Sequence, residues 1–145
     1  MTEGKPDTPR VVGIWITPVR HEPAVAVPAV RALADHGFEG DAHARPGSDR
    51  QLLLMDKETL DTLGLAPGAL KENLTVAAFP LYDQPSGMLL RVGDAVLRLT
   101  GPCTLCAKTE AIRPNLRQEL LGRRGMLARV VEGGEIRVGD RVLRV

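Results

Sequence analysis

Two stretches of this chain repeat each other almost letter for letter, and both have the pattern of a tight corner that leads into a strand. RVGDAVLRL occupies positions 91–99, and RVGDRVLRV occupies positions 137–145. In each copy a Gly-Asp pair separates a short strand-like segment from a run in which apolar and polar residues alternate. Two short copies are too few for a solenoid. The repeat therefore predicts two hairpin-like corners of one design in a curved β-sheet.

Short apolar runs bounded by turn-forming residues predict further strands. These runs occupy 11–16, 51–55, 73–77, 126–131 and 135–138. Gly133 and Gly134 would form a tight hairpin turn before the last of them. The segment 28–35 is ambiguous, because Pro28 and Gly37 flank it as they would flank a helix, although the run is brief.

Two brief helices complete the pattern. Asp56 can cap a helix at 57–63 that ends at Gly64, and a basic helix is predicted at 114–121. Loops are predicted at 37–49 and 79–87. Aromatic residues make up only 3% of the chain, so its core must be aliphatic. Many short strands and few helical residues predict a mainly β, barrel-like domain with a few short helices.

Composition limits the class of protein. With 145 residues, 43% of them apolar and 26% charged, the chain is expected to be a single soluble domain at 11–145 after a disordered tail at 1–10. Its net charge of +1 gives no overall attraction to nucleic acid or membranes. No signal peptide is visible in the polar tail, and no aliphatic run is long enough to span a bilayer. We therefore expect a cytoplasmic protein.

The only two cysteines, Cys103 and Cys106, directly follow a predicted strand at 95–100. Their spacing suits half a zinc site, a dithiol redox centre, or one reactive thiol with a bystander. Zinc would need more ligands than three scattered histidines offer, and the helix of a thioredoxin-type centre is not evident. A reactive thiolate on an arginine-rich loop remains, beside the alternative of two inert, buried thiols.

Two polar segments could surround a ligand. The segment 40–50 is dense in aspartate, histidine and arginine and leads directly into a buried strand, as a binding loop or a solvated turn would. Between a turn and a strand, Glu72 could accept from the amines of a heterocycle and Asn73 could both donate and accept, although simple turn chemistry would use the same residues.

A basic cluster follows the cysteines, and it could clamp a phosphate or form a solvated helix face. Its members are Arg113, Arg117, Arg123, Arg124 and Arg129. The aromatic residues that would accompany a single-stranded nucleic-acid site are missing.

Taken in order, these motifs resemble the MOSC domain, the module named for the C-terminal part of molybdenum cofactor sulfurases. GFEGDAH, DRQLLL, PGALKENL, RVGD, CTLC, RGMLARV and IRVGD carry the resemblance, which runs from about Val11 to the end of the chain. It is closest to the short, stand-alone bacterial branch. The resemblance implies a barrel of the pyruvate kinase β-barrel type.

The resemblance also implies that the domain binds molybdenum cofactor. Cys106 is then the expected sulfur carrier or molybdenum ligand, with Cys103 as the alternative. The residues expected to line the cofactor pocket are Asp41, His43, Arg50, Glu72 and Asn73. Pyridoxal phosphate is not expected, because the desulfurase domain that binds it in larger relatives would not fit in this chain.

Three functions remain open. The domain could carry sulfur or transfer cofactor through its cysteine, with a cysteine desulfurase or a molybdoenzyme as partner. It could instead be a small molybdoenzyme that reduces N-hydroxylated compounds with molybdenum bound to the same thiol. The third alternative is a structural β domain with inert thiols.

Overall fold

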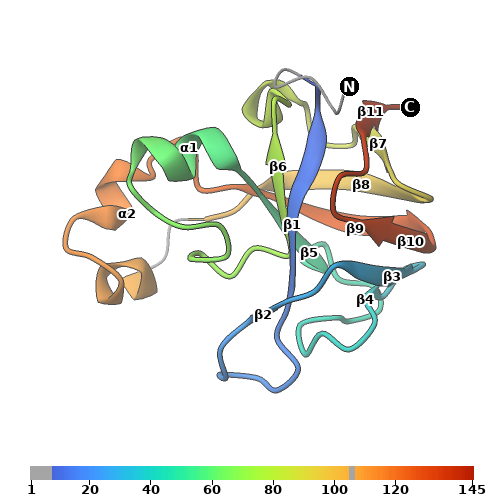
Figure 1. Ribbon diagram of the computed structural model, residues 1–145, viewed down its shortest axis with the longest axis horizontal. Coiled ribbons are helices and arrows are strands. Elements are labelled where there is room, and N and C mark those ends of the chain that lie inside the picture. The colour runs from blue at the N-terminus through green and yellow to red at the C-terminus, as the bar shows by residue number, and fades with distance from the viewer. Residues whose placement is uncertain (1–7, 105–106) are drawn as a thin grey trace.

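The computed structural model describes residues 8–104 and 107–145 and shows a mainly β domain with short helices at one end (Figure 1). The strands are β1 (Arg10–Ile16), β2 (Val25–Ala26), β3 (Ala29–Leu33), β4 (Gly37–Phe38), β5 (Leu52–Asp56), β6 (Leu74–Ala77), β7 (Leu89–Val92), β8 (Ala95–Pro102), β9 (Met126–Glu132), β10 (Gly134–Arg137) and β11 (Val142–Arg144). The helical segments are α1 (Lys57–Thr62), η1 (Leu81–Asp83), η2 (Ala107–Ala111) and α2 (Leu116–Glu119). Among the described residues, no helix is long and apolar enough to cross a membrane.

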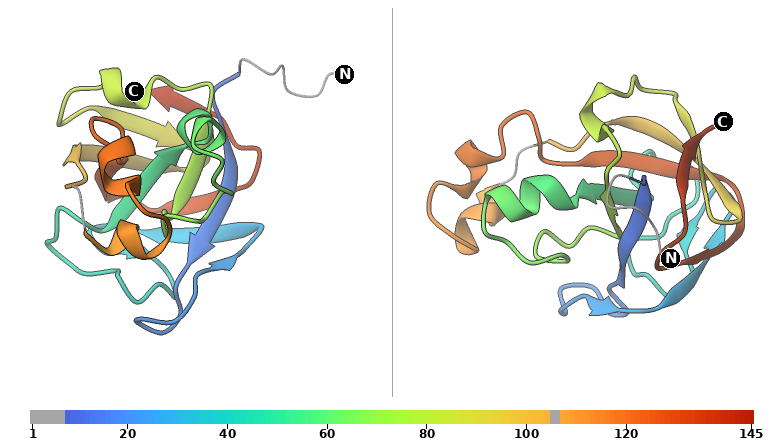
Figure 2. Two further views of the ribbon diagram at one scale, coloured as in Figure 1. Left: turned by 90° about the vertical axis from the view of Figure 1, so that its left-hand side faces the viewer. Right: turned by 45° about the horizontal axis from the view of Figure 1, so that its top comes forward.

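The strands form one large and one small sheet. The large sheet has the order β11-β7-β8-β9-β5-β6-β1-β2, and the small sheet has the order β10-β3-β4. Among the described strands, only β5 and β6 pair in parallel, and α1 provides the crossover that a parallel connection needs. The large sheet curls strongly (Figure 2), so the predicted mainly β, barrel-like fold is confirmed.

The two ends of the curled sheet are joined by backbone hydrogen bonds. Val11 N donates to Asp140 O and Gly139 N donates to Val11 O, each over 2.8 Å. Val142 N donates to Pro9 O over 3.1 Å. We call residues 9–11 with residues 139–142 the closure seam. It brings the start of β1 beside the segment that enters β11 and thereby closes the barrel.

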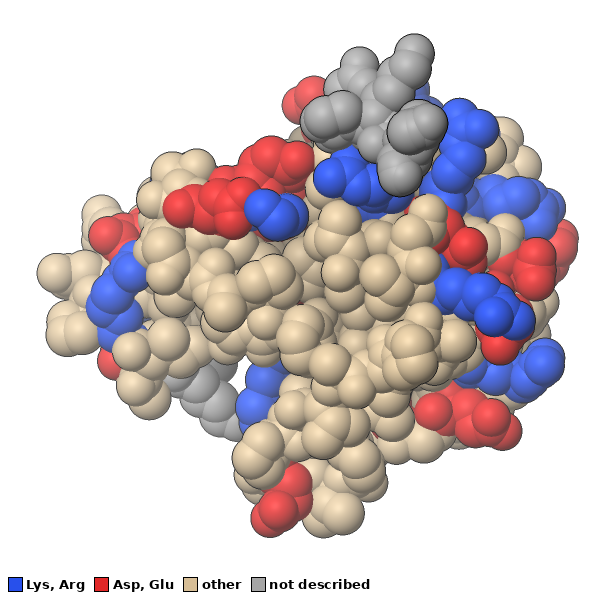
Figure 3. All heavy atoms as spheres, in the orientation of Figure 1, with Lys and Arg blue, Asp and Glu red and all other residues tan. Residues whose placement is uncertain are grey.

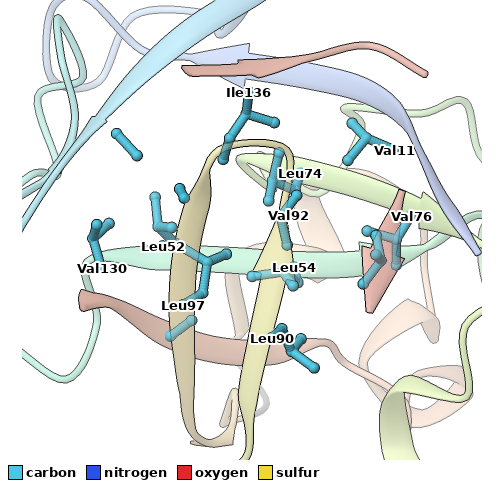
Figure 4. Packing of buried hydrophobic residues seen from close by; sticks show 14 of the residues in the cluster. Val11, Leu52, Leu54, Leu74, Val76, Leu90, Val92, Leu97, Val130 and Ile136 are labelled. Atoms are coloured by element: carbon cyan, nitrogen blue, oxygen red, sulfur yellow. The ribbon is translucent and has the colours of Figure 1, made fainter. Parts of the chain in front are cut away.

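Aliphatic side chains fill the barrel, as the scarcity of aromatic residues predicts (Figure 4). Leu54, Leu74, Leu90 and Leu97 are fully buried there. A second, smaller cluster fixes the helical end of the domain to β5. It consists of Met55, Leu60, Leu70, Leu116 and Leu120. This cluster places α2 and the turn before β6 on the same side of the molecule.

The two sequence repeats have different structures. The first copy is the predicted hairpin of β7 and β8. The second copy is not a hairpin, because β10 pairs with β3 while β11 pairs with β7. The two corners pack directly on each other, and a side chain at Gly93 would collide with Asp140. The second copy therefore connects the small sheet to the edge of the large one and completes the closure seam.

The structure settles one ambiguous segment and shows that one predicted hairpin turn is wrong. The ambiguous segment 28–35 contains β3, in which buried Val30 and Ala32 alternate with exposed Arg31. The turn at Gly133 and Gly134 is not a hairpin, because β9 and β10 belong to different sheets. A Cβ at Gly133 would lie 2.8 Å from Ala32 O, so the chain needs glycine where it bends between the sheets.

The predicted limits of the first helix are confirmed, whereas the predicted loop at 37–49 begins with the short strand β4. Asp56 caps α1 by accepting a hydrogen bond from Thr59 N over 3.1 Å, and Gly64 follows the helix with a φ of 69°. The basic helix is shorter than predicted. Asn115 has a φ of 68°, which is not helical, so α2 begins only after it.

Candidate functional site

The segment that follows β8 leads from the barrel to the helical end and contains both cysteines. Cys103 is half-buried, its N–H donates to Gly125 O over 2.9 Å, and its thiol donates to Thr104 O over 3.6 Å. Cys106, the predicted carrier and metal ligand, lies outside the described residues. The geometry of one predicted thiol can therefore be described.

Cys103 lines a cavity of about 420 Å³, which we call the thiol cavity. Its other lining residues are Tyr82, Gln84, Ser86, Pro102, Gly122, Arg124, Gly125 and Met126. Gln84 is only 6% exposed, and its Nε2 donates to Pro80 O over 2.9 Å. Its Oε1 has no hydrogen-bond partner among the described residues. The cavity thus contains a thiol and a wall residue with an unused acceptor.

A second cavity of about 520 Å³ lies beside the helical end, and we call it the basic cavity. It is lined by Arg20, His21, His43, Ala69, Leu70, Lys71, Thr109, Ala111, Ile112 and Arg124. Figure 3 shows a recess between the helical end and the β1–β2 loop, with a basic side chain at its margin. No carboxylate belongs to the lining within the described chain. Such a surface favours an anionic ligand.

Arg124 lines both cavities. It precedes Gly125, whose φ is 105° and where a Cβ would lie 2.7 Å from Leu54 O. This close approach of the turn to β5 fixes the position from which Arg124 extends. The Nε and Nη1 atoms of Arg124 are buried, and neither has a hydrogen-bond partner in the described part of the protein. Buried polar atoms without a partner are costly, so an anion that pairs with them would be stabilised.

Asp41 and Asn73 form a buried network next to the basic cavity. Asp41 Oδ1 accepts from Thr17 N over 2.8 Å, and its Oδ2 accepts from Asn73 Nδ2 over 3.2 Å. His43 Nδ1 lies 3.8 Å from Asp41 Oδ1, and His43 belongs to the cavity lining. Asp41 and Asn73 therefore support the loop that presents His43.

Glu72 has a similar supporting position. It is fully buried, and its Oε2 accepts from Gly68 N over 2.8 Å and from Thr75 Oγ1 over 2.6 Å. These bonds hold the turn that carries Leu70 and Lys71 into the basic cavity. Glu72 Oε1 has no partner among the described residues, so one oxygen remains available to a donor.

Arg50 lies apart from both cavities. Its backbone N–H donates to Ser48 Oγ over 3.0 Å, and the residue is exposed. Of the five polar residues expected to line the cofactor pocket, His43 alone lines either of the two cavities described. Direct contact of the other four with a cofactor stays a prediction.

The basic cluster predicted after the cysteines does not form one surface. Arg113 binds Leu63 O and Glu119, and Arg129 binds Asp35 and Asp49. Only Arg124 reaches the cavities. Sequence reasoning missed Arg20, His21 and Lys71, because no local pattern shows that the β1–β2 loop and the turn before β6 meet.

Tyr82 lies on the wall of the thiol cavity, and its hydroxyl keeps its proton and acts as a hydrogen-bond donor. Its hydroxyl lies 2.8 Å from Asp56 Oδ1 and 2.8 Å from Arg123 O, both of which can only accept. Burial and the negative charge of Asp56 raise the pKa of Tyr82 far above its ordinary value. Tyr82 therefore holds α1 against the turn before Arg124 and does not supply protons to the cavity.

Metal ligands are scarce in the described structure. Within residues 8–104 and 107–145, no group of three or more histidine, cysteine, aspartate and glutamate side chains could hold a metal ion. A metal in this region would need ligands from a cofactor or from the remaining cysteine.

Comparisons with known proteins give a family from a family model and a fold from solved structures. A family model of the MOSC domain matches residues 39–143. The crystal structure of YuaD from Bacillus subtilis is 19% identical, with a TM-score of 0.75 over 93% of this chain and 94% of that one. YiiM from Escherichia coli is 20% identical, with a TM-score of 0.72 over 94% and 69% of the two chains. YiiM from Geobacillus stearothermophilus is 21% identical, with a TM-score of 0.68 over 96% and 74%. A search among curated proteins gave no match.

Proposed function

The chain belongs to the MOSC domain family, and we propose that it binds molybdenum cofactor and carries sulfur, or transfers the cofactor to a partner enzyme, through a thiol of the segment 103–106. The position of Arg124 carries this proposal. Arg124 lines both the basic cavity and the thiol cavity, and two of its guanidinium nitrogens have no partner among the described residues. An anionic ligand held there would lie next to the cysteine segment.

The basic cavity fits a pterin with a phosphate tail. Arg20, Lys71 and Arg124 supply cationic donors for a phosphate, and the guanidinium groups can bind its oxygens in a forked geometry. Leu70 and Ile112 supply apolar surface for a planar ring. When bound, the cofactor would supply a molybdenum centre, for which a thiolate is a suitable soft ligand.

The carrier role is supported by different observations for the two cysteines. Cys106 is the expected carrier and molybdenum ligand from the family resemblance. Cys103 has direct structural support, because it lines a cavity and is half-buried. A cysteine desulfurase would supply sulfur to such a domain, and a molybdoenzyme would receive the sulfur or the cofactor.

His43 favours a second candidate function, a small molybdoenzyme that reduces N-hydroxylated compounds. Such a reduction consumes protons, and a histidine at the cavity wall is a suitable proton donor. His43 lines the basic cavity, and its Nδ1 lies 3.8 Å from Oδ1 of the buried Asp41. In this alternative the same thiol binds molybdenum.

The test is the metal and sulfur content of protein purified from cells that make the cofactor. Molybdenum and pterin are measured by mass spectrometry, and persulfide is mapped by peptide analysis. The wild type is compared with Cys103→Ser, Cys106→Ser and Arg124→Met. Arg117→Met is the matched control, because Arg117 lies exposed on α2 and lines neither cavity.

The proposal expects substoichiometric pterin, lost in Arg124→Met but kept in Arg117→Met, and a labile persulfide on one cysteine. Stoichiometric molybdenum that disappears only in Cys106→Ser would favour the reductase. Protein with neither pterin nor persulfide would leave a structural domain with inert thiols and would refute the proposal.

A further inference from the structure

The thiol cavity has a different chemistry from the basic cavity, which indicates a different ligand. The basic cavity is lined by five basic side chains. Among the described residues that line the thiol cavity, there is one cation, Arg124, and one buried acceptor without a partner, Gln84 Oε1. A phosphate suits the first arrangement. The second suits a ligand that carries both a hydrogen-bond donor and an anionic group.

We propose that the thiol cavity binds a low-molecular-weight persulfide of the α-amino-acid class, such as cysteine persulfide, and that its outer sulfur is transferred to Cys103. This inference rests on the proposed carrier function and replaces direct transfer from a desulfurase protein by transfer from a small-molecule donor. The ammonium group would donate to Gln84 Oε1, and the carboxylate would accept from Arg124.

Gln84 provides the first half of the recognition. Its Nε2 donates to Pro80 O, and its Oε1 has no hydrogen-bond partner among the described residues. Gln84 is 6% exposed, so water does not readily satisfy that oxygen. Buried polar groups are usually paired, and an acceptor without a partner on a side chain that lines the cavity favours a ligand that brings a donor.

Arg124 provides the second half. A guanidinium matches the two oxygens of a carboxylate, and the bond gains strength where water is excluded. Among the described lining residues of the thiol cavity, none is an aspartate or glutamate that would repel a carboxylate. Pro102 and Met126 are apolar lining residues that a short thiol side chain can contact. The volume of about 420 Å³ accepts a single small molecule of this size.

The transfer step is balanced without an external oxidant or reductant. The thiolate of Cys103 attacks the outer sulfur of the donor R–S–SH. A sulfur–sulfur bond forms at Cys103, and the sulfur–sulfur bond of the donor breaks with its electron pair remaining on R–S⁻. The outer sulfur keeps its proton, and R–S⁻ takes a proton from solvent. The products are a Cys103 persulfide and a free aminothiol.

The experiment compares three donors on the full chain with the substitution Cys106→Ser, so that Cys103 is the only thiol. The donors are the persulfides of cysteine, of cysteamine, which lacks the carboxylate, and of mercaptopropionate, which lacks the ammonium. Initial rates of sulfur addition are measured by intact-protein mass spectrometry at low donor concentration. Gln84→Met and Arg124→Met are the test variants, and Arg117→Met is the control.

Loss of one charge-assisted hydrogen bond corresponds to about a tenfold loss of affinity. We therefore expect cysteine persulfide to react about tenfold faster than either truncated donor, and Arg117→Met to keep this preference. Gln84→Met should abolish the preference for cysteine persulfide over mercaptopropionate persulfide, and Arg124→Met the preference over cysteamine persulfide. A merely structural effect would slow all three donors alike.

Equal rates for the three donors, or variants that slow all donors equally, would overturn the donor site and leave the carrier function standing. The same preference seen on Cys106 in a Cys103→Ser protein would overturn the assignment to Cys103. Absence of sulfur addition from every donor, to either thiol, would overturn the donor site and the carrier function together.

Discussion

Replacing Asn73 with alanine should destabilise the domain by about 3–5 kcal/mol, because this one side chain connects three segments of the barrel. Its Oδ1 accepts from Leu53 N over 3.0 Å in β5, and its Nδ2 donates to Asp41 Oδ2 and, over 3.3 Å, to Trp15 O. Removal leaves a strand N–H and a buried carboxylate oxygen unpaired, and each costs about 1–3 kcal/mol. The longer bond to Trp15 O adds little.

The measurement is urea unfolding at pH 7, followed by the fluorescence of the single tryptophan. Asn115→Gly is the matched control. Asn115 is exposed, has a φ of 68° that glycine adopts freely, and makes no side-chain capping bond, so its loss should cost less than about 0.5 kcal/mol. A loss below about 1 kcal/mol in Asn73→Ala would refute the reasoning, since it would mean that water or a rearranged neighbour satisfies both groups.

Asn73→Asp tests the same network through pH. It would place a second carboxylate beside Asp41 Oδ2, which accepts from Asn73 Nδ2 over 3.2 Å, and two carboxylates at such a distance share a proton, so one pKa rises above its unfolded value. The unfolded state then binds fewer protons, and stability falls as pH rises from about 4. The deficit of Asn73→Asp relative to wild type should therefore shrink from pH 7 to about pH 4.5. A deficit independent of pH would show that the two carboxylates do not interact.

Two further predictions follow from shifted pKa values. Because burial and the charge of Asp56 raise the pKa of Tyr82, the only tyrosine, its absorbance should show no ionisation near pH 10 in the folded protein, and the stability linked to this proton should be lost as pH rises above about 10. A normal titration of the folded protein near pH 10 would contradict the buried hydroxyl. Hydrogen bonds from Arg129, Gly47 N and Gln51 lower the pKa of Asp35 below 3.8, so its stabilising contribution is present above that pH and is lost as pH falls below it. Arg129→Gln should flatten the acid limb of the unfolding midpoint plotted against pH, and an unchanged limb would show that Arg129 does not control Asp35.

Features that depend on neighbouring residues could be predicted from the sequence, and features that depend on distant pairing could not. Asp56 lies three residues before the N–H that it caps, and the first Gly-Asp corner joins two strands that pair with each other. The second copy has almost the same residues, yet β10 pairs with β3 and β11 pairs with β7, and both partners are far away in the chain. The segment 28–35 looked helical at its flanks, and only the burial of alternate residues in β3 identifies it as a strand.

The candidate site follows the same division. The sequence identified Cys103 and His43 as chemically distinctive residues, and both line cavities. It could not show that Arg113 and Arg129 pair with carboxylates while Arg124 lines both cavities, because that depends on where Glu119, Asp35 and Asp49 lie in space. Arg124 is distinguished from its neighbours only by the fold.

The closure seam has a consequence for how the protein is made. Residues 9–11 leave the ribosome long before their hydrogen-bond partners at 139–142, which are synthesised only after the rest of the domain. Until then one edge of β1 remains unpaired, and an exposed strand edge can pair with another nascent chain. Contacts between residues so distant in the chain also form slowly during folding. We therefore expect the newly made chain to need a low concentration or chaperones during translation to avoid aggregation. It should become resistant to aggregation once the hydrogen bonds of the closure seam have formed.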